Sequence, residues 1–432
     1  MTSTISPTTA RPAGLRRTII GTGIGNAIEW YDWAVYAAFA PFIAAALFSK
    51  ADPTSAILST LAIFAVGFVA RPLGGLIFGW IGDRKGRKIS MTLAVGLASA
   101  GSLLIGVAPT FEATGSFASM VLLAARLIQG LAHGGELPSS QTYLCEMAPK
   151  EKRGFWATLI FFSGTLGNEL GVLLGAILAM TLTKDSMMAW GWRLPFLLGA
   201  VLGLYALVMR ARMSETKTFL NEDASAKRAP IWPQIVQHRK QALQVIGLTI
   251  GLTAAYYVWA ISAPAYAISA LKMDPGAAFW AGLTANIAFL IALPLWGKLS
   301  DKIGRKPVLW IGAIGAAAFH FPMTFLLKDQ PWQLTVSMAV MLIFLAASAA
   351  IVPAVFAELF PTSIRTVGVG IPYSICVAVF GGTAPFLKEG FGIWFGAATG
   401  ATIFAAYIVL LLAVTFICIF TIPETKGKDL RG

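Results

Sequence analysis

The sequence has 432 residues, of which 57% are hydrophobic and only 12% are charged, and its mean hydropathy is +0.73. Soluble domains carry about 25% charged residues, so this composition excludes a soluble multidomain protein. The net charge of +13 does not indicate a nucleic-acid partner, because the Lys and Arg residues lie in short polar breaks and form no basic groove with interleaved aromatic residues. The 3 cysteines have no CxxC spacing and indicate neither a disulfide framework nor a metal site, and no cofactor other than protons is expected.

Apolar stretches of about 20 residues or more recur along the chain and predict membrane-spanning helices. The first stretch, 18–48, is too long for the core of a signal peptide, so we expect it to be retained as the first helix. Breaks at Gly, Pro and charged clusters divide the chain into about twelve helices. Their predicted centres are Tyr31, Gly67, Ala100, Leu131, Gly167, Val201, Tyr256, Ala288, Ala316, Val340, Val377 and Ile408.

The longest polar interval, residues 214–240, divides the chain near its middle. It predicts a linker between two bundles of six helices. The predicted parts are an N-terminal tail (1–16), a first bundle (17–213), the linker (214–240), a second bundle (241–422) and a C-terminal tail (423–432).

The placement of the Lys and Arg residues predicts the orientation of the chain in the membrane. If the N-terminus is cytoplasmic, twenty-five of these residues fall on the cytoplasmic side and six on the other side. Cytoplasmic loops are enriched in Lys and Arg, so both termini are expected in the cytoplasm. The two remaining basic residues, Arg71 and Arg126, fall within predicted spans.

Two motifs occur once in each half. Gly79-Trp-Ile-Gly-Asp83-Arg84-Lys-Gly86-Arg87-Lys88 matches Gly297-Lys-Leu-Ser-Asp301-Lys302-Ile-Gly304-Arg305-Lys306, and Glu146-x-x-Pro149-x-x-x-Arg153 matches Glu358-x-x-Pro361-x-x-x-Arg365. The recurrence indicates two parallel repeats with a site between them near the midplane, an architecture suited to alternating access.

At these motifs the sequence resembles the major facilitator superfamily, whose signature between helices 2 and 3 has the form G-x-x-x-D-[RK]-x-G-R-[RK]. Other segments resemble its metabolite:proton symporter branch. They are Gly25-Asn26-Ala-Ile-Glu29-Trp30-Tyr31-Asp32-Trp33, Arg71-Pro72-Leu-Gly74-Gly75, Arg126-x-x-Gln129-Gly130, Gly134-Gly135-Glu136 and Trp190-Gly-Trp192-Arg193-x-Pro195-Phe196.

The resemblance implies an all-α polytopic membrane protein with twelve transmembrane helices in two pseudo-symmetric six-helix bundles, present as a monomer in a bacterial inner membrane. It also implies proton-coupled import of a small organic acid. Members of the branch import carboxylates such as 2-oxoglutarate, citrate and shikimate, or zwitterions such as proline and betaine, so a zwitterion is the alternative substrate. The sequence departs from the branch at His133, where a small residue is commoner, and at Glu169, where no carboxylate is expected.

A membrane-embedded enzyme is the main alternative class, because acidic and histidine side chains within predicted spans are potential acids and bases. The sequence lacks an HExxH metal-ligand pair, a GxSxG nucleophile turn and a phosphate-binding loop. A transporter is therefore favoured over an enzyme.

Four side chains are candidates for proton coupling. Asp32 and Glu29 share a helix face at a depth where a charge costs on the order of 2.5 to 3.5 kcal/mol, and neighbouring carboxylates raise one pKa. His133 titrates near neutrality, and Glu136 follows on the same helix. The alternatives are structural: the acids pair permanently with intramembrane arginines, and His133 is a hydrogen-bonded packing residue.

The candidates for substrate binding centre on Arg126, which shares a helix face with Gln129 and can hold a carboxylate through two parallel hydrogen bonds. Arg71 is a second candidate, and the structural alternative for both arginines is a permanent ion pair. For Glu169 the alternative is an interhelical hydrogen bond made by the neutral acid. Further candidates are Asn26, Tyr36, Asn168, Tyr256, Tyr257 and Tyr373, and for the tyrosines a lipid-facing or core position is the alternative.

The recurring charged residues at helix ends predict a cytoplasmic gate that holds in only one conformational state. Simple topology anchoring is the alternative. The gate candidates are Asp83, Arg84, Arg87, Glu146, Arg153, Asp301, Arg305, Glu358 and Arg365.

Overall fold

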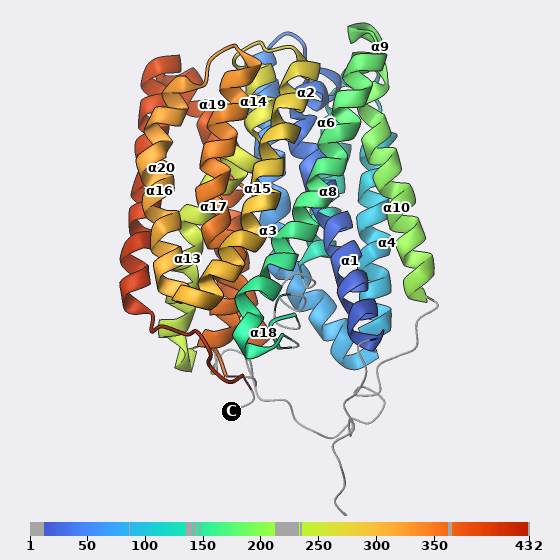
Figure 1. The fold of residues 1–432 in the computed structure, drawn as a ribbon. Helices are drawn as coiled ribbons and strands as arrows, with labels where there is room; N and C mark the ends of the chain where they lie inside the picture. The colour runs from blue at the N-terminus through green and yellow to red at the C-terminus, as the bar shows by residue number, and fades with distance from the viewer. Residues whose placement is uncertain are drawn as a thin grey trace, which may run out of the picture.

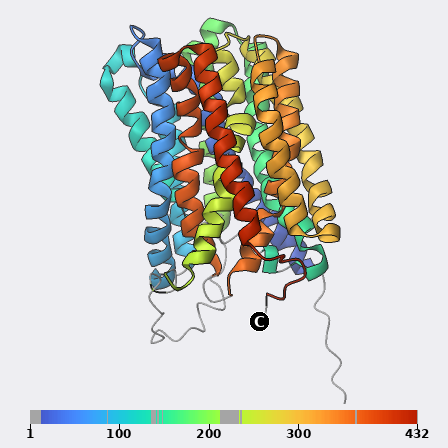
Figure 2. The same cartoon turned by 90° about the vertical axis from the view of Figure 1, so that its left-hand side faces the viewer.

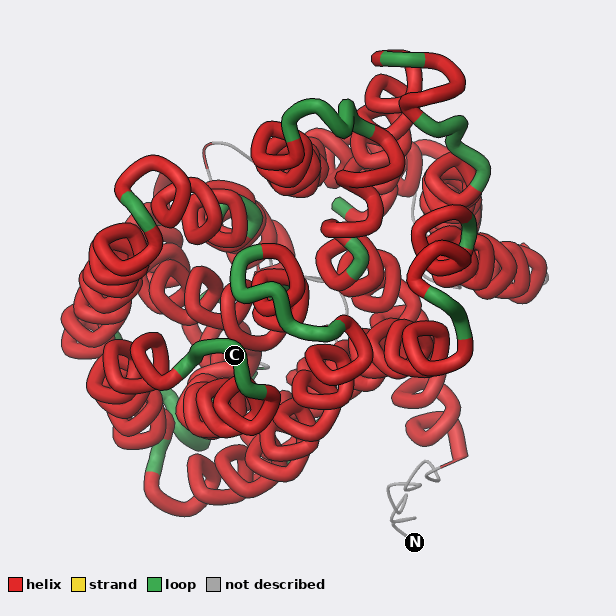
Figure 3. The backbone as a smooth tube through the Cα atoms, turned by 90° about the horizontal axis from the view of Figure 1, so that it is seen from above, coloured by secondary structure: helices red, strands yellow, loops and turns green. Residues whose placement is uncertain are grey.

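The computed structural model describes residues 13–85, 87–134, 141, 144–146, 148–211, 233, 236–361 and 365–430. These residues form helices and connecting loops, with no strand among them (Figure 3). Residues 1–12 of the predicted N-terminal tail and most of the predicted linker lie outside the described residues, and residues 13–16 already belong to the first helix.

The described residues of the N-terminal half form six long helical spans. They are α1 (Ala13–Ala38) continued by α2 (Ala40–Leu47), α3 (Pro53–Lys85), α4 (Arg87–Gly106), α6 (Ser116–His133), α8 (Arg153–Thr181) and α10 (Leu194–Ala211). Two short helices, α5 (Phe111–Thr114) and α9 (Lys184–Ala189), lie in the loops of this half.

The part of the C-terminal half that the structure describes also forms six spans, two of which are interrupted. The first is α13 (Arg239–Tyr256), η3 (Tyr257–Ile261) and α14 (Ala263–Ser269), followed by α15 (Pro275–Ile303), α16 (Arg305–Leu326) and α17 (Pro331–Leu359). The fifth is α18 (Arg365–Cys376), η5 (Val377–Gly381) and α19 (Ala384–Phe395), and the sixth is α20 (Ala397–Thr421). The chain thus has the twelve-helix, two-bundle fold that the sequence predicts, and the predicted helix centres all fall within these spans.

The halves stand side by side, with the blue-to-green helices on one side and the yellow-to-red helices on the other (Figure 1). Helix α8 packs against both α15 and α17, and α3 packs against α18, η5 and α19. Helix α1 begins at the same face where α20 ends and the chain reaches its last described residues (Figure 2). We call this face the terminal face.

Local sequence explains several helix ends. Asp274 caps α15 by accepting a hydrogen bond from the backbone N–H of Ala277, and Pro275 starts the helix without needing a partner for an N–H. Gly304 separates α15 from α16 with a φ of 107°, a conformation that side chains with a Cβ rarely adopt.

Two spans of the C-terminal half contain a single wide π-helical turn. In η3 the N–H of Ser262 bonds to the carbonyl of Tyr257, and in η5 the N–H of Gly382 bonds to that of Val377. A proline follows each turn, and because Pro264 has no N–H, the carbonyl of Ala260 is free to accept a hydrogen bond from another helix.

Candidate functional site

Two arginines of the N-terminal half lie against one indole ring. The guanidinium carbons of Arg71 (α3) and Arg126 (α6) lie 4.1 and 4.0 Å from the ring centroid of Trp33 (α1). Arg126 also lies 4.3 Å from the ring of Tyr36, whose hydroxyl donates to the carbonyl of Thr60. Aromatic faces stabilise a guanidinium that has left water, which explains how α1, α3 and α6 accommodate two cations so close together.

A chain of hydrogen bonds links Arg126 to Asp32. Arg126 Nη1 donates to Gln129 Oε1 at 2.8 Å, Gln129 Nε2 donates to the Ser102 hydroxyl at 2.8 Å, and that hydroxyl donates to Asp32 Oδ1 at 3.0 Å. Arg126 is fully buried, and its Nε and Nη2 atoms have no hydrogen-bond partner among the described residues. Buried N–H groups normally have a partner, so these donors are available to an anion.

The other titratable candidates lie next to this chain. Arg71 Nη2 is 3.7 Å from Glu29 Oε1, and His133 Nε2 is 3.8 Å from Asp32 Oδ2. A cavity of about 30 Å³ lies inside the N-terminal half and is lined by Glu29, Asp32 and His133 together with residues of α4 and α10 such as Ser99. The carboxyl groups and the imidazole give a water molecule polar partners in a cavity of this size, so a proton could reach both carboxyl groups there.

The C-terminal half contributes tyrosines to the same region. Tyr257 packs edge-on against Phe68 with ring centroids 5.2 Å apart, and Tyr256 packs against Trp30 at 5.8 Å. Tyr373 lies within electrostatic reach of Tyr257 and of the Arg71–Glu29 pair. The structure therefore brings Tyr256 and Tyr257 to the boundary between the halves, and Tyr257 and Tyr373 into the electrostatic surroundings of Arg71.

The remaining candidates occupy helix contacts. Asn26 donates to the carbonyl of Ile160 and to the hydroxyl of Ser163, so it joins α1 to α8 within the N-terminal half. Asn168 donates to Glu169 Oε1 at 2.7 Å, and both side chains are buried. Glu136 lies outside the described residues, as do the side chains of Asp83, Arg84 and Arg87.

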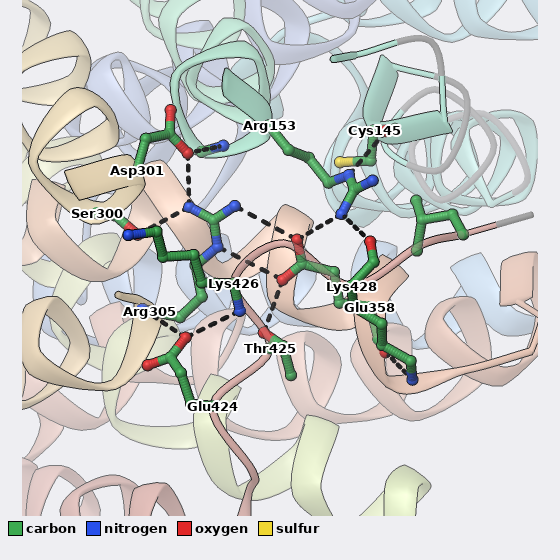
Figure 4. Close-up of polar contacts among 12 residues, drawn as sticks. Cys145, Arg153, Ser300, Asp301, Arg305, Glu358, Glu424, Thr425, Lys426 and Lys428 are labelled. Atoms are coloured by element: carbon green, nitrogen blue, oxygen red, sulfur yellow. Dashed lines mark hydrogen bonds and ion pairs between the residues drawn. The ribbon is translucent and has the colours of Figure 1, made fainter. Parts of the chain in front are cut away.

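The second group of candidates forms a network across the two halves at the terminal face (Figure 4). Arg153 Nη1 donates to Glu358 Oε1 at 2.8 Å, and Arg305 reaches the same carboxylate at 3.3 Å. Arg365 of the C-terminal half donates to Glu146 of the N-terminal half, so here the arginine and the carboxylate come from the opposite halves to those in the Arg153–Glu358 pair. Together with Asp301, these five residues make up what we call the gate network.

Asp301 connects the gate network to the start of a helix. Its carboxylate accepts hydrogen bonds from the backbone N–H groups of Gly154 (2.8 Å) and Phe155 (2.9 Å) at the N-terminus of α8, and from Arg305 Nη1 at 2.8 Å. A carboxylate is stabilised at this position because the first N–H groups of a helix have no partner within the helix. Asp301 therefore ties α15 of one half to α8 of the other.

The last described residues cover the gate network. Arg153 Nη1 donates to the carbonyl of Lys428 at 2.9 Å, Arg365 Nη2 donates to the carbonyl of Leu430 at 3.2 Å, and Thr425 donates to Glu358 Oε2 at 2.6 Å. Leu430 packs with Cys145, which belongs to the other half. The tail thus contacts both halves.

Glu424 anchors this tail to α16. Its carboxylate accepts hydrogen bonds from the backbone N–H groups of Arg305 (2.9 Å) and Lys306 (3.1 Å) at the helix N-terminus, and from that of Lys426 (2.9 Å). Partial burial opposes ionisation, but these donors prevail and lower the pKa of the Glu424 carboxyl below its ordinary value.

Several neighbours of the site were not among the predicted residues. Trp33 belongs to a quoted motif, but nothing in the sequence indicates that it lies between two arginines. Ser102, the middle of the hydrogen-bond chain, is one serine in an apolar helix and carries no signal of its own. The backbone carbonyls of Lys428 and Leu430 could not be found from residue types at all.

No group of three or more His, Cys, Asp or Glu side chains that could hold a metal ion occurs among the described residues. Ten described helices are long and apolar enough to cross a membrane. Together with the span formed by α1 and α2 and the shorter apolar helix α4, they account for twelve spans.

Comparisons with known proteins agree with this architecture. The family model described as "Sugar (and other) transporter" matches residues 18–244 and 229–432. The alpha-ketoglutarate permease of Escherichia coli (strain K12) is 33% identical over 96% of this chain and 94% of the permease. A putative proline/betaine transporter of Staphylococcus aureus (strain COL) is 32% identical over 96% of this chain and 90% of that transporter.

The fold also matches solved structures. A crystal structure of a D-xylose-proton symporter superposes with a TM-score of 0.73 at 20% identity, covering 96% of this chain and 100% of the symporter chain. At that identity the match bears on the fold alone, whereas the sequence matches extend over nearly the whole chain. The twelve-span fold and these full-length matches show that the chain belongs to the sugar (and other) transporter family of the major facilitator superfamily, and so to the multi-pass membrane transporters.

Proposed function

We propose that this protein imports a small organic acid together with protons by alternating access across a bacterial inner membrane, with the terminal face in the cytoplasm. The observation that carries the proposal is the hydrogen-bond chain from Arg126, which has free donors for a carboxylate, to Asp32, which can carry a proton. The names of the full-length relatives, a permease for alpha-ketoglutarate and a transporter for proline or betaine, support a small acid as the substrate.

The chain gives a physical route for coupling. When Asp32 is ionised, its negative charge stabilises the hydrogen-bond chain through Ser102 and Gln129. The same charge offsets part of the positive charge of Arg126. A proton on Asp32 removes that charge, so Arg126 interacts more strongly with an incoming carboxylate. Proton binding and substrate binding then favour each other, which is the reciprocity that symport requires.

The membrane potential explains why a proton is needed. A monoanion entering a cell that is negative inside works against about 2.3 kcal/mol per 100 mV, and one accompanying proton cancels this cost. Additional protons would drive accumulation. The substrate and the proton are the only ligands in this proposal, with no further cofactor and with transport in place of catalysis.

The gate network would act as the cytoplasmic gate. In the described conformation the buried Arg153–Glu358 pair and the Arg365–Glu146 pair join the halves at the terminal face, an arrangement that would close the site from the cytoplasm. Release of the substrate to the cytoplasm would require these pairs to separate. The tail residues 424–430 add contacts to the closed state.

A zwitterion such as proline or betaine is the second candidate substrate. Glu169 favours it, because a buried carboxylate can balance a positive group on the substrate. In this case the proton adds driving force without having to cancel a substrate charge.

Transport in right-side-out membrane vesicles tests the proposal. With an acid-outside gradient, we expect accumulation of labelled 2-oxoglutarate or labelled proline above its external concentration. Asp32→Asn should abolish this accumulation but retain exchange of internal for external substrate, because Arg126 is intact. Asp185→Asn, an exposed residue of α9, is the matched control and should transport normally. Undiminished accumulation in Asp32→Asn would remove Asp32 as the proton carrier.

A further inference from the structure

Helices α8 and α15 form the central contact between the two halves and run antiparallel, side by side in Figure 1. Near the terminal face, a Cβ added at Gly297 would lie 2.5 Å from Thr158 Cγ2. Toward the opposite face, a Cβ added at Gly175 would lie 3.1 Å from Phe279 Cε2. The two helices are therefore in contact on both sides of the level between these points.

The helical repeat places two polar residues opposite each other at that level. Glu169 comes eleven residues after Thr158 on α8, and Asn286 comes eleven residues before Gly297 on α15. Eleven residues are about three turns, so each residue lies on the same face as its reference residue and about three turns further from the terminal face. Because the helices are antiparallel, Glu169 faces α15 where Asn286 faces α8.

Both residues keep an acceptor oxygen without a partner. Glu169 is 7% exposed and Asn286 is 1% exposed. Glu169 Oε1 accepts from Asn168, and Asn286 Nδ2 donates at 3.5 Å to the Ala260 carbonyl that Pro264 leaves free, but Glu169 Oε2 and Asn286 Oδ1 have no hydrogen-bond partner among the described residues.

Two buried acceptors at about the same level of neighbouring helices have no hydrogen-bond donor among the described residues. A carboxylate and an amide carbonyl accept hydrogen bonds and donate none from these oxygens. Leaving such groups unsatisfied costs roughly 1–3 kcal/mol each, and more when the group is charged. A proton on Glu169 supplies one donor when the acid is neutral, whereas a positively charged N–H group of a ligand can donate to both oxygens while Glu169 stays ionised.

The same region connects to the arginines through a pair of tyrosines. Glu169 interacts electrostatically with Tyr256, whose ring lies 6.1 Å from that of Tyr257. Tyr257 in turn interacts electrostatically with Arg126. The tyrosine pair thus links the region of the unpartnered carboxylate oxygen, through Tyr256, to the region of the unpartnered guanidinium donors, through Tyr257.

We propose that Glu169 and Asn286 form a subsite for the protonated amino group of the substrate, whose carboxylate binds Arg126. This inference rests on the proposed function and narrows the substrate to amino acids with a primary or secondary ammonium group. A quaternary ammonium has no N–H to donate, so it fits the subsite less well. A plain carboxylate leaves both acceptors unsatisfied.

Binding to the purified full-length protein tests the subsite with compounds that differ only at nitrogen. Glutamate is compared with glutarate, and proline with cyclopentanecarboxylate and with N,N-dimethylproline, by thermal shift and competition. We expect the compound with an ammonium N–H to bind at least tenfold more tightly than each of its partners. Equal affinities within each set would overturn the inference.

Substitutions test whether Glu169 and Asn286 cause the preference for compounds with an ammonium N–H. In Glu169→Gln and in Asn286→Leu, both close in size to the native residues, the affinity ratio within each set should fall below about threefold. Glu389→Gln, a buried carboxyl of α19 outside this contact, is the matched control and should keep the wild-type ratio. An unchanged ratio in both subsite variants overturns the assignment even if the wild type prefers amino acids.

Uptake in the same vesicles separates this inference from the proposed function. If an acid-outside gradient drives glutarate uptake as well as glutamate uptake, the proposed function holds and the subsite is wrong. If none of the compounds binds and the gradient drives no uptake, both fail.

Discussion

Arg153 of the first half pairs with Glu358 of the second half at 2.8 Å, although each belongs to a motif that contains its own oppositely charged residue. The equivalent pair, Arg365 with Glu146, runs in the opposite direction. The two copies of the repeated Glu–Arg motif therefore exchange partners, so the motif joins the two bundles to each other.

Removing the charge of Glu358 should weaken the closed gate. Glu358→Gln leaves Arg153 and Arg305 buried without their shared carboxylate, and loss of one partner of a buried pair typically costs about 3–5 kcal/mol. Separation of the halves hydrates both arginines, so this cost falls on the closed state. We expect Cys145, which is 0% exposed beside the gate, to react with a membrane-permeant maleimide at least tenfold faster.

The labelling is done with Cys376 and Cys418 replaced by Ser, so that Cys145 is the only thiol. Glu112→Gln, which removes an exposed ion pair with Lys50, serves as the control and should label at the wild-type rate. Slow labelling in Glu358→Gln would show that the gate network does not hold the terminal face closed.

The tail contact should depend on pH through Glu424. Its pKa is lowered in the folded protein, so the stabilisation is fully present above the ordinary carboxyl pKa and is lost as the pH falls through the lowered value. We expect protease cleavage after Lys426 or Lys428 to be slow at neutral pH and to accelerate in acid. Because the side chain is largely exposed to solvent, the change in cleavage rate with pH should be modest.

The Glu424→Gln variant should be cleaved already at neutral pH at the rate that the wild type shows in acid. Its cleavage rate should also lose most of its dependence on pH. The amide can still accept hydrogen bonds from Arg305 and Lys306, so loss of the cap should cost no more than about 1 kcal/mol. An acid-activated cleavage that persists in this variant would assign the dependence to another group.

The geometry of Arg126 should matter as well as its charge. Arg126→Lys keeps a cation near Trp33 but loses the planar fork and the bond to Gln129. We expect the apparent affinity for a carboxylate substrate to fall at least tenfold, which is about 1.4 kcal/mol. Substrate-dependent thermal shifts measure the affinity, and the melting temperature without substrate serves as the folding control.

Close packing of α1 against α8 should make one glycine indispensable. A Cβ at Gly167 would lie 1.9 Å from the backbone carbonyl oxygen of Ala27, which cannot move as a side chain can. Gly167→Ala should destabilise the protein by about 1–3 kcal/mol, as overpacking typically does. Gly392→Ala, where a Cβ meets no atom within 4 Å, should leave the detergent melting temperature nearly unchanged.

Much of the fold follows from the sequence because hydrophobic length and charge placement are local properties. Each predicted helix centre falls in an observed span, and the two-fold recurrence of the charged motifs reflects the two bundles. The wide turns in η3 and η5 could not be predicted in the same way. Their backbone geometry depends on tertiary contacts, such as the hydrogen bond from Asn286 to Ala260.

The candidate site was recoverable as a set of residues but not as a set of partners. The cost of a charge in an apolar span draws attention to Asp32, Arg71 and Arg126 without any structure. Which residues meet depends on how helices that are far apart in the sequence pack, so the shared contact with Trp33 could not be foreseen.

The wide turns at Tyr257–Ile261 and Val377–Gly381 divide two helices of the C-terminal half into segments with different attachments. Broken ladders of this kind are where helices bend. The segments farther from the terminal face, α14 and α19, can therefore change their tilt while α13 and α18 keep their position relative to the gate network. Such a joint lets the end of the C-terminal bundle opposite the terminal face open by itself, so that a solute can enter or be excluded there while the ion pairs stay formed.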